Sequence, residues 1–185
     1  PFEYRIVYAS GKDRNDSGGL LHTNFTISKA GGYLALVASD GTTVLSEYTY
    51  GAQAEDIAYG ELGSARTRGY METPTPETKN AGLQASGLPA ESVQFDRTGG
   101  MFVGSTTLTI LPTMSATAVV RYTTNGTVPS QVSPAYSSPF SITGTTTVRA
   151  RVFDAGRLPG EIKSRTLIEL AADVADFNSA LPIIV

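Results

Sequence analysis

The sequence predicts an all-β fold made of two β-sandwich modules in tandem. Short runs rich in Val, Ile, Thr and Tyr recur along the chain, as is typical of strands on a half-buried sheet surface. The 19 glycines and 10 prolines separate these runs and suit short strands joined by turns. Asp40-Gly41 and Asn125-Gly126 each indicate a two-residue hairpin, because both central positions of that turn need a positive φ.

The first half of the chain holds five predicted strands. Tyr4, Ile6 and Tyr8 recur at period two, which places them on one face of the first strand. The apolar run 33–37 has no polar interruption, and we expect that strand to be buried on both faces. A polar loop is expected over residues 11–19. The five strands are expected over residues 4–8, 22–27, 33–37, 43–50 and 57–60.

Prolines mark the predicted boundary between the modules. Pro74 and Pro76 cannot donate to a sheet ladder because proline has no backbone N–H. The residues that follow are mostly small and polar, as in a linker. We therefore predict four segments: a first module at 1–80, a linker at 81–89, a second module at 90–170, and at 171–185 a linker with the start of a further module.

In the second half, apolar residues alternate with threonine or arginine, which predicts strands with one buried face. Arg149 and Arg151 have no acidic residue near them in the sequence, and we expect them to face solvent. Leu170, Val174 and Phe177 are spaced for one face of a short helix. Leu108 and Ile110 share one strand face, as do Val120, Tyr122 and Thr124 on the next strand and Val148, Ala150 and Val152 on the closing strand.

Composition excludes several classes of function. The net charge is −3, with seven basic and ten acidic side chains in 1–87 and seven of each in 88–185, so no basic surface for nucleic acid is expected. No apolar run approaches the length of a membrane helix. Cysteine is absent, which removes disulfides and thiolate metal sites and leaves the compartment open. Because the chain opens on Pro1 and closes on an apolar run at 181–185, we expect an interior part of a longer polypeptide.

No group of residues is placed for catalysis or for a cofactor. His22, the single histidine, has no partner visible in the sequence and is predicted to be structural. Asp13, Asn15 and Asp16 offer oxygen ligands for calcium, but their spacing favours turn chemistry. Glu55 and Asp56 are adjacent. On a strand they would point to opposite faces, so they are not expected to act as a carboxylate pair.

Tyrosines are the candidate contact residues. Tyr48 and Tyr50 share one strand face with Val44 and Ser46. Tyr122 and Tyr136 belong to the second module. Such rings can stack on sugars or anchor a protein partner, and the alternative is that they are half-buried at the rim of a sandwich.

Two families resemble this chain. Residues 20–80 resemble the later part of a lamin-tail domain, and residues 90–170 resemble the immunoglobulin-like C-terminal module of chitobiase and beta-hexosaminidase proteins. The lamin-tail likeness rests on 21–27, 33–43, 56–60 and 73–80. The chitobiase likeness rests on 120–126 with Pro129, 133–136, 139–140 and 142–153.

The resemblances imply two immunoglobulin-like β-sandwiches, the first lacking its opening strands, and therefore an open sheet edge. They bring no catalytic residues to this stretch. The run 181–185 resembles the start of a further module, commonly a spore-coat-H-like kinase domain.

The expected function is non-catalytic: a spacer or attachment region of a bacterial secreted or cell-surface protein, contacting a protein or a cell-surface polysaccharide. The alternative is a carbohydrate-binding accessory module of a polysaccharide-degrading enzyme. The oligomeric state stays open.

Overall fold

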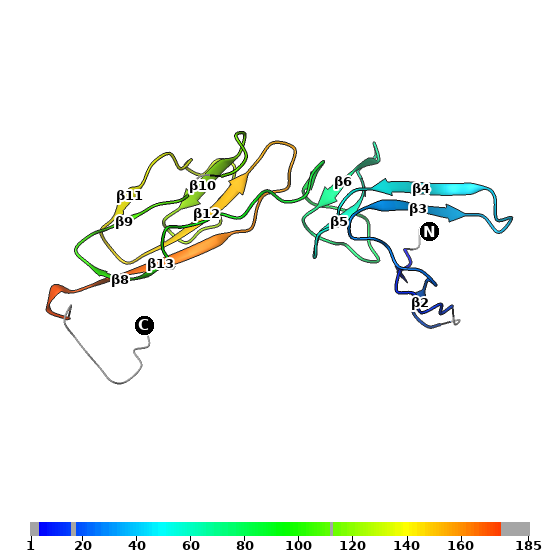
Figure 1. Cartoon of the computed structure of the whole chain (residues 1–185), viewed down its shortest axis with the longest axis horizontal. Helices are drawn as coiled ribbons and strands as arrows, with labels where there is room; N and C mark the ends of the chain where they lie inside the picture. Colours follow the sequence, from blue (N-terminus) through cyan, green and yellow to red (C-terminus); the bar gives the residue numbers. More distant parts are fainter. Residues whose placement is uncertain (1–3, 16–17, 112, 175–185) are drawn as a thin grey trace. The chain divides into compact units, whose positions relative to one another are not determined.

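The computed structural model describes residues 4–15, 18–111 and 113–174, and its architecture is all-β (Figure 1). The chain divides into two compact units, Pro1–Leu88 and Pro89–Val185. The prediction of an all-β, immunoglobulin-like fold is confirmed. Within the described residues, no helix has the length and apolar composition that crossing a membrane requires.

The second unit is a β-sandwich of a four-stranded and a two-stranded sheet. The larger sheet has the order β10-β12-β13-β8, and the smaller pairs β11 with β9. All neighbours are antiparallel except β13 and β8, which are parallel. The strands are β8 (Gly100–Val103), β9 (Thr106–Leu108), β10 (Val119–Thr123), β11 (Phe140–Ile142), β12 (Thr146–Phe153) and β13 (Lys163–Leu170).

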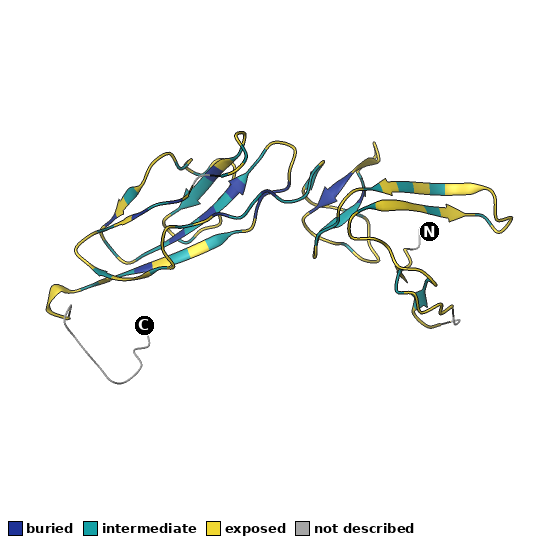
Figure 2. Cartoon of the chain, in the orientation of Figure 1, coloured by how far each residue is buried: buried dark blue, intermediate teal, exposed yellow. Residues whose placement is uncertain are grey.

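Side chains from both sheets form the core of this unit. Val148, Ala150 and Val152 alternate along β12 and are fully buried, as their spacing predicts (Figure 2). Leu108 of β9 and Ile142 of β11 pack with Val148 in one cluster. The contact joins the two sheets across their facing sides, which is what makes the unit a sandwich.

The arginines on the other face of β12 differ from the prediction. Arg149 donates from Nη1 to the carbonyl of Gly126 at 3.1 Å, and Arg151 donates from Nε to the carbonyl of Gly160 at 2.6 Å. Both side chains are half-buried. The prediction that they face solvent is therefore wrong, because backbone carbonyls of neighbouring loops supply the partners that the sequence lacks.

Asn125-Gly126 does form a turn, but not a two-residue hairpin. Gly126 has φ 76°, whereas Asn125 is not among the residues with positive φ. The Asn125 side chain instead accepts from the backbone N of Thr127 at 3.1 Å, which is an Asx turn. β10 pairs with β12, and a bridge between Arg121 and Ala135 joins it to the chain that follows the turn.

The first unit consists of three small sheets. β1 and β2 form a short parallel pair, β3 and β4 an antiparallel hairpin, and β5-β6-β7 a three-stranded sheet. Tyr70 and Met71 of β6 are buried. The strands are β1 (Val7–Tyr8), β2 (Leu21–His22), β3 (Gly32–Val37), β4 (Val44–Tyr50), β5 (Ala58–Leu62), β6 (Thr67–Met71) and β7 (Gln84–Ala85).

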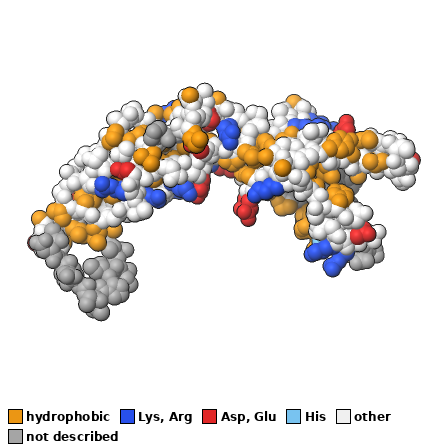
Figure 3. Space-filling model, in the orientation of Figure 1, with side chains coloured by type: hydrophobic (Ala, Val, Ile, Leu, Met, Phe, Trp, Pro, Cys, Tyr) orange, Lys and Arg blue, Asp and Glu red, His pale blue; other side chains and the backbone are white. Residues whose placement is uncertain are grey.

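The β3–β4 hairpin turns at Asp40-Gly41, but not by the predicted two-residue turn, because Asp40 is not among the residues with positive φ and the strands end at Val37 and resume at Val44. Asp40 accepts from the backbone N of Thr42 and of Thr43, both at 2.9 Å, and Gly41 has φ 72°. β3 itself is mostly exposed, and Leu36 is 63 % exposed. Apolar side chains lie along this hairpin on the visible face (Figure 3). The prediction that 33–37 is buried on both faces is wrong, because side chains on both faces of the strand are exposed, Tyr33 by 58 % and Leu34 by 39 %.

Other strand predictions hold in part. The first and second predicted strands shorten to two-residue elements, and β6 arises where no strand is predicted. β7 lies inside the predicted linker 81–89 and pairs with β6. The domain limits themselves stay predictions.

The predicted short helix through Leu170, Val174 and Phe177 is wrong at Leu170, because that residue ends β13. A 3-10 turn follows at Ala172–Val174, and Phe177 lies outside the described residues.

Candidate functional site

A groove of about 860 Å³ lies in the first unit. Its lining comes from β3, β4 and β5, from the loop 75–80 and from the segment 4–6, with Ile27, Gln53, Gly63 and Arg66. Tyr48 and Tyr50 both line it, as do Tyr59 and Leu34. Two of the four tyrosines singled out from the sequence are thus brought together at one concave surface.

The position of Tyr50 depends on a glycine in the facing strand. Gly32 is the ladder partner of Tyr50. A Cβ atom at Gly32 would lie 2.9 Å from the Tyr50 hydroxyl oxygen and 3.2 Å from the Cζ atom that carries it. The missing side chain at Gly32 therefore leaves the space that the Tyr50 ring occupies beside the groove.

Tyr48 contacts the cation of Arg68 and lies near the carboxylate of Glu61. The Arg68 guanidinium carbon is 4.5 Å from the centroid of the Tyr48 ring, within range of a cation–π interaction. Burial raises the pKa of Tyr48 above its usual 10.0, and the negative charge of Glu61 raises it further. The phenol therefore keeps its proton at neutral pH.

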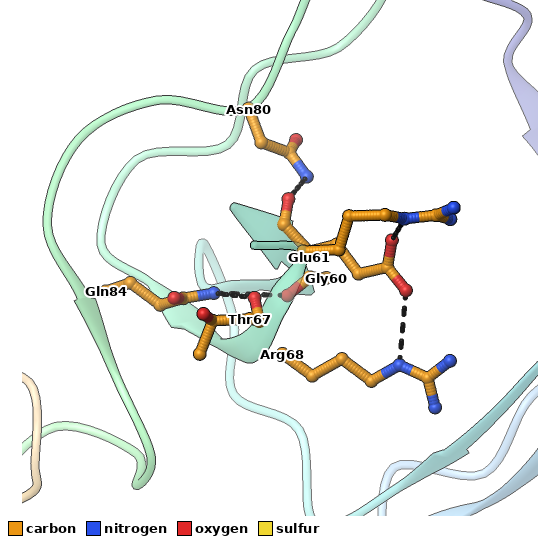
Figure 4. A network of polar contacts seen from close by, with 7 residues as sticks. Gly60, Glu61, Thr67, Arg68, Asn80 and Gln84 are labelled. Atoms are coloured by element: carbon orange, nitrogen blue, oxygen red, sulfur yellow. Dashed lines mark hydrogen bonds and ion pairs between the residues drawn. The ribbon is translucent and has the colours of Figure 1, made fainter. Parts of the chain in front are cut away.

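Glu61 of β5 organises the charges at the groove (Figure 4). Its carboxylate accepts from Nε of Arg66 at 2.5 Å and from Nε of Arg68 at 3.3 Å. The hydrogen bond from Arg66 is the main cause that lowers the pKa of Glu61 below 4.5. One carboxylate thus holds two guanidinium groups in place.

Amide side chains fix the loop 75–80 and β7 to this sheet (Figure 4). Asn80 donates from Nδ2 to the carbonyl of Glu61 at 2.8 Å, and its Oδ1 accepts from the Thr75 hydroxyl at 3.1 Å. Gln84 donates from Nε2 to the carbonyls of Thr67 at 2.8 Å and Gly60 at 3.2 Å. The wall of the groove is therefore held by hydrogen bonds before any ligand arrives.

The two tyrosines of the second unit lie elsewhere. Tyr122 stacks on Phe140 with ring centroids 4.8 Å apart. The Tyr136 hydroxyl accepts from the backbone N of Ile110 at 3.1 Å. Both rings pack against the buried core cluster and are half-buried. Their surroundings favour the alternative reading of packing over ligand contact.

His22 has local partners in the first unit. Its Nδ1 is 2.8 Å from the Ser10 hydroxyl oxygen, and its ring stacks on Tyr8 with centroids 5.1 Å apart. These contacts tie β2 to the segment of β1, in keeping with a structural histidine.

The described acidic candidates lie outside the strands. Asp13 has φ 48° and Asp56 has φ 58°, so both adopt left-handed backbone. Glu55 and Asp56 are in a turn and not on a strand, contrary to the geometry assumed for them. Asp16 lies outside the described residues. In the described ranges, no three His, Asp or Glu side chains are grouped to hold a metal ion.

Sequence reasoning missed the charged side of the groove. Glu61, Arg66 and Arg68 meet because β5 and β6 form a hairpin, and the register pairs Glu61 with Arg68. Two signals for that hairpin were available. One is the glycine at 63, whose φ is 72°, and the other is the alternation of Arg68 and Tyr70 around Gly69.

Comparison with known proteins finds a similar family for part of the chain. Residues 97–164 match the family model of the chitobiase/beta-hexosaminidase C-terminal domain. The predicted resemblance of 90–170 is thereby confirmed over that range, while the likeness of 20–80 to a lamin-tail domain stays a prediction. No curated protein and no solved structure matches the chain. Over residues 97–164 the chain is therefore similar to a non-catalytic, immunoglobulin-like module that occurs in glycosidases.

Proposed function

We propose that this chain is a non-catalytic structural or attachment region of a larger bacterial protein that is secreted or displayed at the cell surface. Its two units hold neighbouring parts of that protein and present a surface to a protein or to a cell-surface polysaccharide. The observation that carries the proposal is the match of residues 97–164 to a non-catalytic module.

The construction of the second unit supports a role as rigid scaffolding. Leu108, Val148 and Leu158 are fully buried. The hydroxyl of Tyr136 and the guanidinium of Arg149 bond to backbone groups, so these polar side chains serve the fold. A closed core of this kind keeps the ends of a module at a fixed separation.

Hydrolysis assays test the proposal. The purified chain is incubated with chitooligosaccharides and with a chromogenic N-acetylglucosaminide, and products are followed by chromatography. We expect no product above the rate without protein. Turnover that follows the chain through successive purification steps, and that is lost on its removal by antibody, would contradict the proposal.

A second candidate is a carbohydrate-binding accessory module. The observation that favours it is the groove of the first unit, where Tyr48 and Tyr50 lie beside the amide side chains of Gln53 and Asn80. Aromatic rings together with a few fixed polar groups are typical of ligand sites. Pull-down of the chain by a panel of insoluble and immobilised glycans, with Tyr50→Ala as the variant, tests this candidate. Retention that Tyr50→Ala weakens supports it, and absence of retention on the whole panel excludes it.

A further inference from the structure

Basic side chains gather at the groove although the first unit is acidic as a whole. The segment 1–88 carries seven basic and ten acidic side chains. Three of the seven basic side chains, those of Arg5, Arg66 and Lys79, line the groove, and a fourth, Arg68, stacks on Tyr48. Among the described residues, two of the acidic side chains line it. Charge is therefore distributed unevenly, with positive charge concentrated at the concave surface.

The acidic side chains at the groove do not cancel this charge. Glu61 is shared between Arg66 and Arg68, so its single negative charge faces two positive ones. The other, Glu77, lies in the loop 75–80 at a position with φ 60°. Among the described lining residues, three cations against two carboxylates leave a local excess of one positive charge, which attracts an anionic ligand.

The basic groups remain accessible to a solute. The Arg66 side chain is 72 % exposed, and it contacts Glu61 through Nε. Lys79 is exposed and forms no ion pair with the described residues. Guanidinium and ammonium groups in such positions bind carboxylate or sulfate oxygens with charge-assisted hydrogen bonds.

The aromatic part of the lining favours sugar rings. Tyr48, Tyr50 and Tyr59 present flat, amphipathic surfaces with hydroxyl groups at their ends. Gln53 and Thr78 add polar side chains that can bond to ligand hydroxyls. An extended peptide on a sheet would instead pair with an open strand edge and place its side chains in alternating pockets.

We propose that this groove binds an acidic polysaccharide, with sugar rings packed on Tyr48 and Tyr50 and with Arg66 and Lys79 drawing the acidic groups of the sugar. The proposal rests on the carbohydrate-binding function given second above and specifies its ligand. Binding is electrostatic in part, so it weakens as salt screens the charges.

The test compares each acidic glycan with its own uncharged form. The whole chain is applied to immobilised oligogalacturonate, alginate and hyaluronan, and to the same three glycans after reduction of their carboxyl groups to alcohols. Poly-L-glutamate serves as a polyanion without sugar rings. We expect binding to at least one acidic glycan, at least fivefold weaker binding to its reduced form, and no comparable binding to poly-L-glutamate.

Two variants link the binding to the groove. Lys79→Gln and Arg66→Gln are each expected to weaken it roughly threefold, the effect of one partly exposed charge. Lys12→Gln, which removes a cation of the same unit outside the groove lining, is the matched control and should leave the affinity unchanged. Thermal melting of each variant checks that the fold is retained.

The outcomes separate this inference from the proposed function. Equal binding to acidic and reduced glycans, lost in Tyr50→Ala, keeps the carbohydrate function and overturns the acidic ligand. Equal binding to poly-L-glutamate overturns the sugar and indicates an acidic protein partner. No binding to any glycan overturns both and leaves the spacer function. An equal loss in Lys12→Gln and Lys79→Gln also overturns the assignment to the groove.

Discussion

Gly32 and Tyr50 face each other across the β3–β4 ladder, and the tyrosine fills the space that a side chain at Gly32 would take. The Tyr50 hydroxyl oxygen lies only 2.9 Å from where a Cβ at Gly32 would be. One residue without a side chain thus places a ring at the groove.

Replacing this glycine is expected to disturb the hairpin. Gly32→Ala should loosen it by less than the about 1–3 kcal/mol that overpacking costs in a closed core, because Gly32 is exposed, and should displace the Tyr50 ring. Amide hydrogen exchange at β3 and β4 measures the first effect and glycan retention the second. Gly144→Ala is the control because a Cβ there meets no atom within 4 Å. Equal exchange rates for Gly32→Ala and the unaltered chain would contradict the prediction.

The hairpin turn should weaken in acid. The hydroxyl of Thr43, with the backbone N–H groups of Thr43 and Thr42, bonds to the Asp40 carboxylate and lowers its pKa from 3.8 to about 2. A carboxyl whose pKa is lower in the folded state stabilises that state above pH 3.8, and the contribution is lost as pH falls toward 2.

Carbon-detected NMR titration of Asp40 measures this pKa, and exchange of the Thr43 amide follows the turn. In Asp40→Asn the amide oxygen can still accept from the backbone, so the turn should persist and its dependence on pH should vanish. A midpoint for Asp40 near its ordinary 3.8 would show that the capping bonds do not form in solution.

Leucines of the second unit should differ sharply in their contribution to stability. Leu108 is fully buried, so Leu108→Ala should lower the free energy of unfolding by about 2–5 kcal/mol. Leu111, three residues later, is 45 % exposed, and Leu111→Ala should cost well under half as much. Urea denaturation of both variants checks the difference. Similar costs would contradict the placement of the core.

Tyr136 should matter for stability and not for binding. Tyr136→Phe removes the acceptor for the backbone N of Ile110 and should cost about 1 kcal/mol or more. Glycan retention should be unchanged. Tyr33→Phe is the control, since its hydrogen bond to Glu47 is exposed and its loss should cost little. Reduced glycan retention in Tyr136→Phe would contradict the prediction and would indicate that Tyr136 contacts a ligand.

Local patterns predicted the parts of the fold that depend on neighbours in sequence. The alternation of Val148, Ala150 and Val152 gave the buried face of β12, and Asp40-Gly41 gave the β3–β4 turn. Asn125-Gly126 is an equally strong hairpin signal. There the chain crosses to β11 before it returns in β12, so tertiary pairing overrides the local preference.

The candidate site was only half visible in the sequence. Tyr48 and Tyr50 could be placed on one strand face from their spacing alone. The contact between Arg66 and Glu61 could not be predicted from sequence spacing, because the two side chains meet through the β5–β6 hairpin. The exposure of β3 could not be predicted from local pattern either, since an apolar run does not reveal how many layers cover it.

NMR of the isotope-labelled chain mixed with an acidic oligosaccharide tests the account most directly, because one sample reports both binding and cleavage. We predict that the amide signals of β4, β5 and residues 75–80 shift, that those of β9 to β12 stay in place, and that the oligosaccharide remains intact. Shifts centred on Tyr122 and Tyr136, or signals of shortened sugar chains, would contradict it.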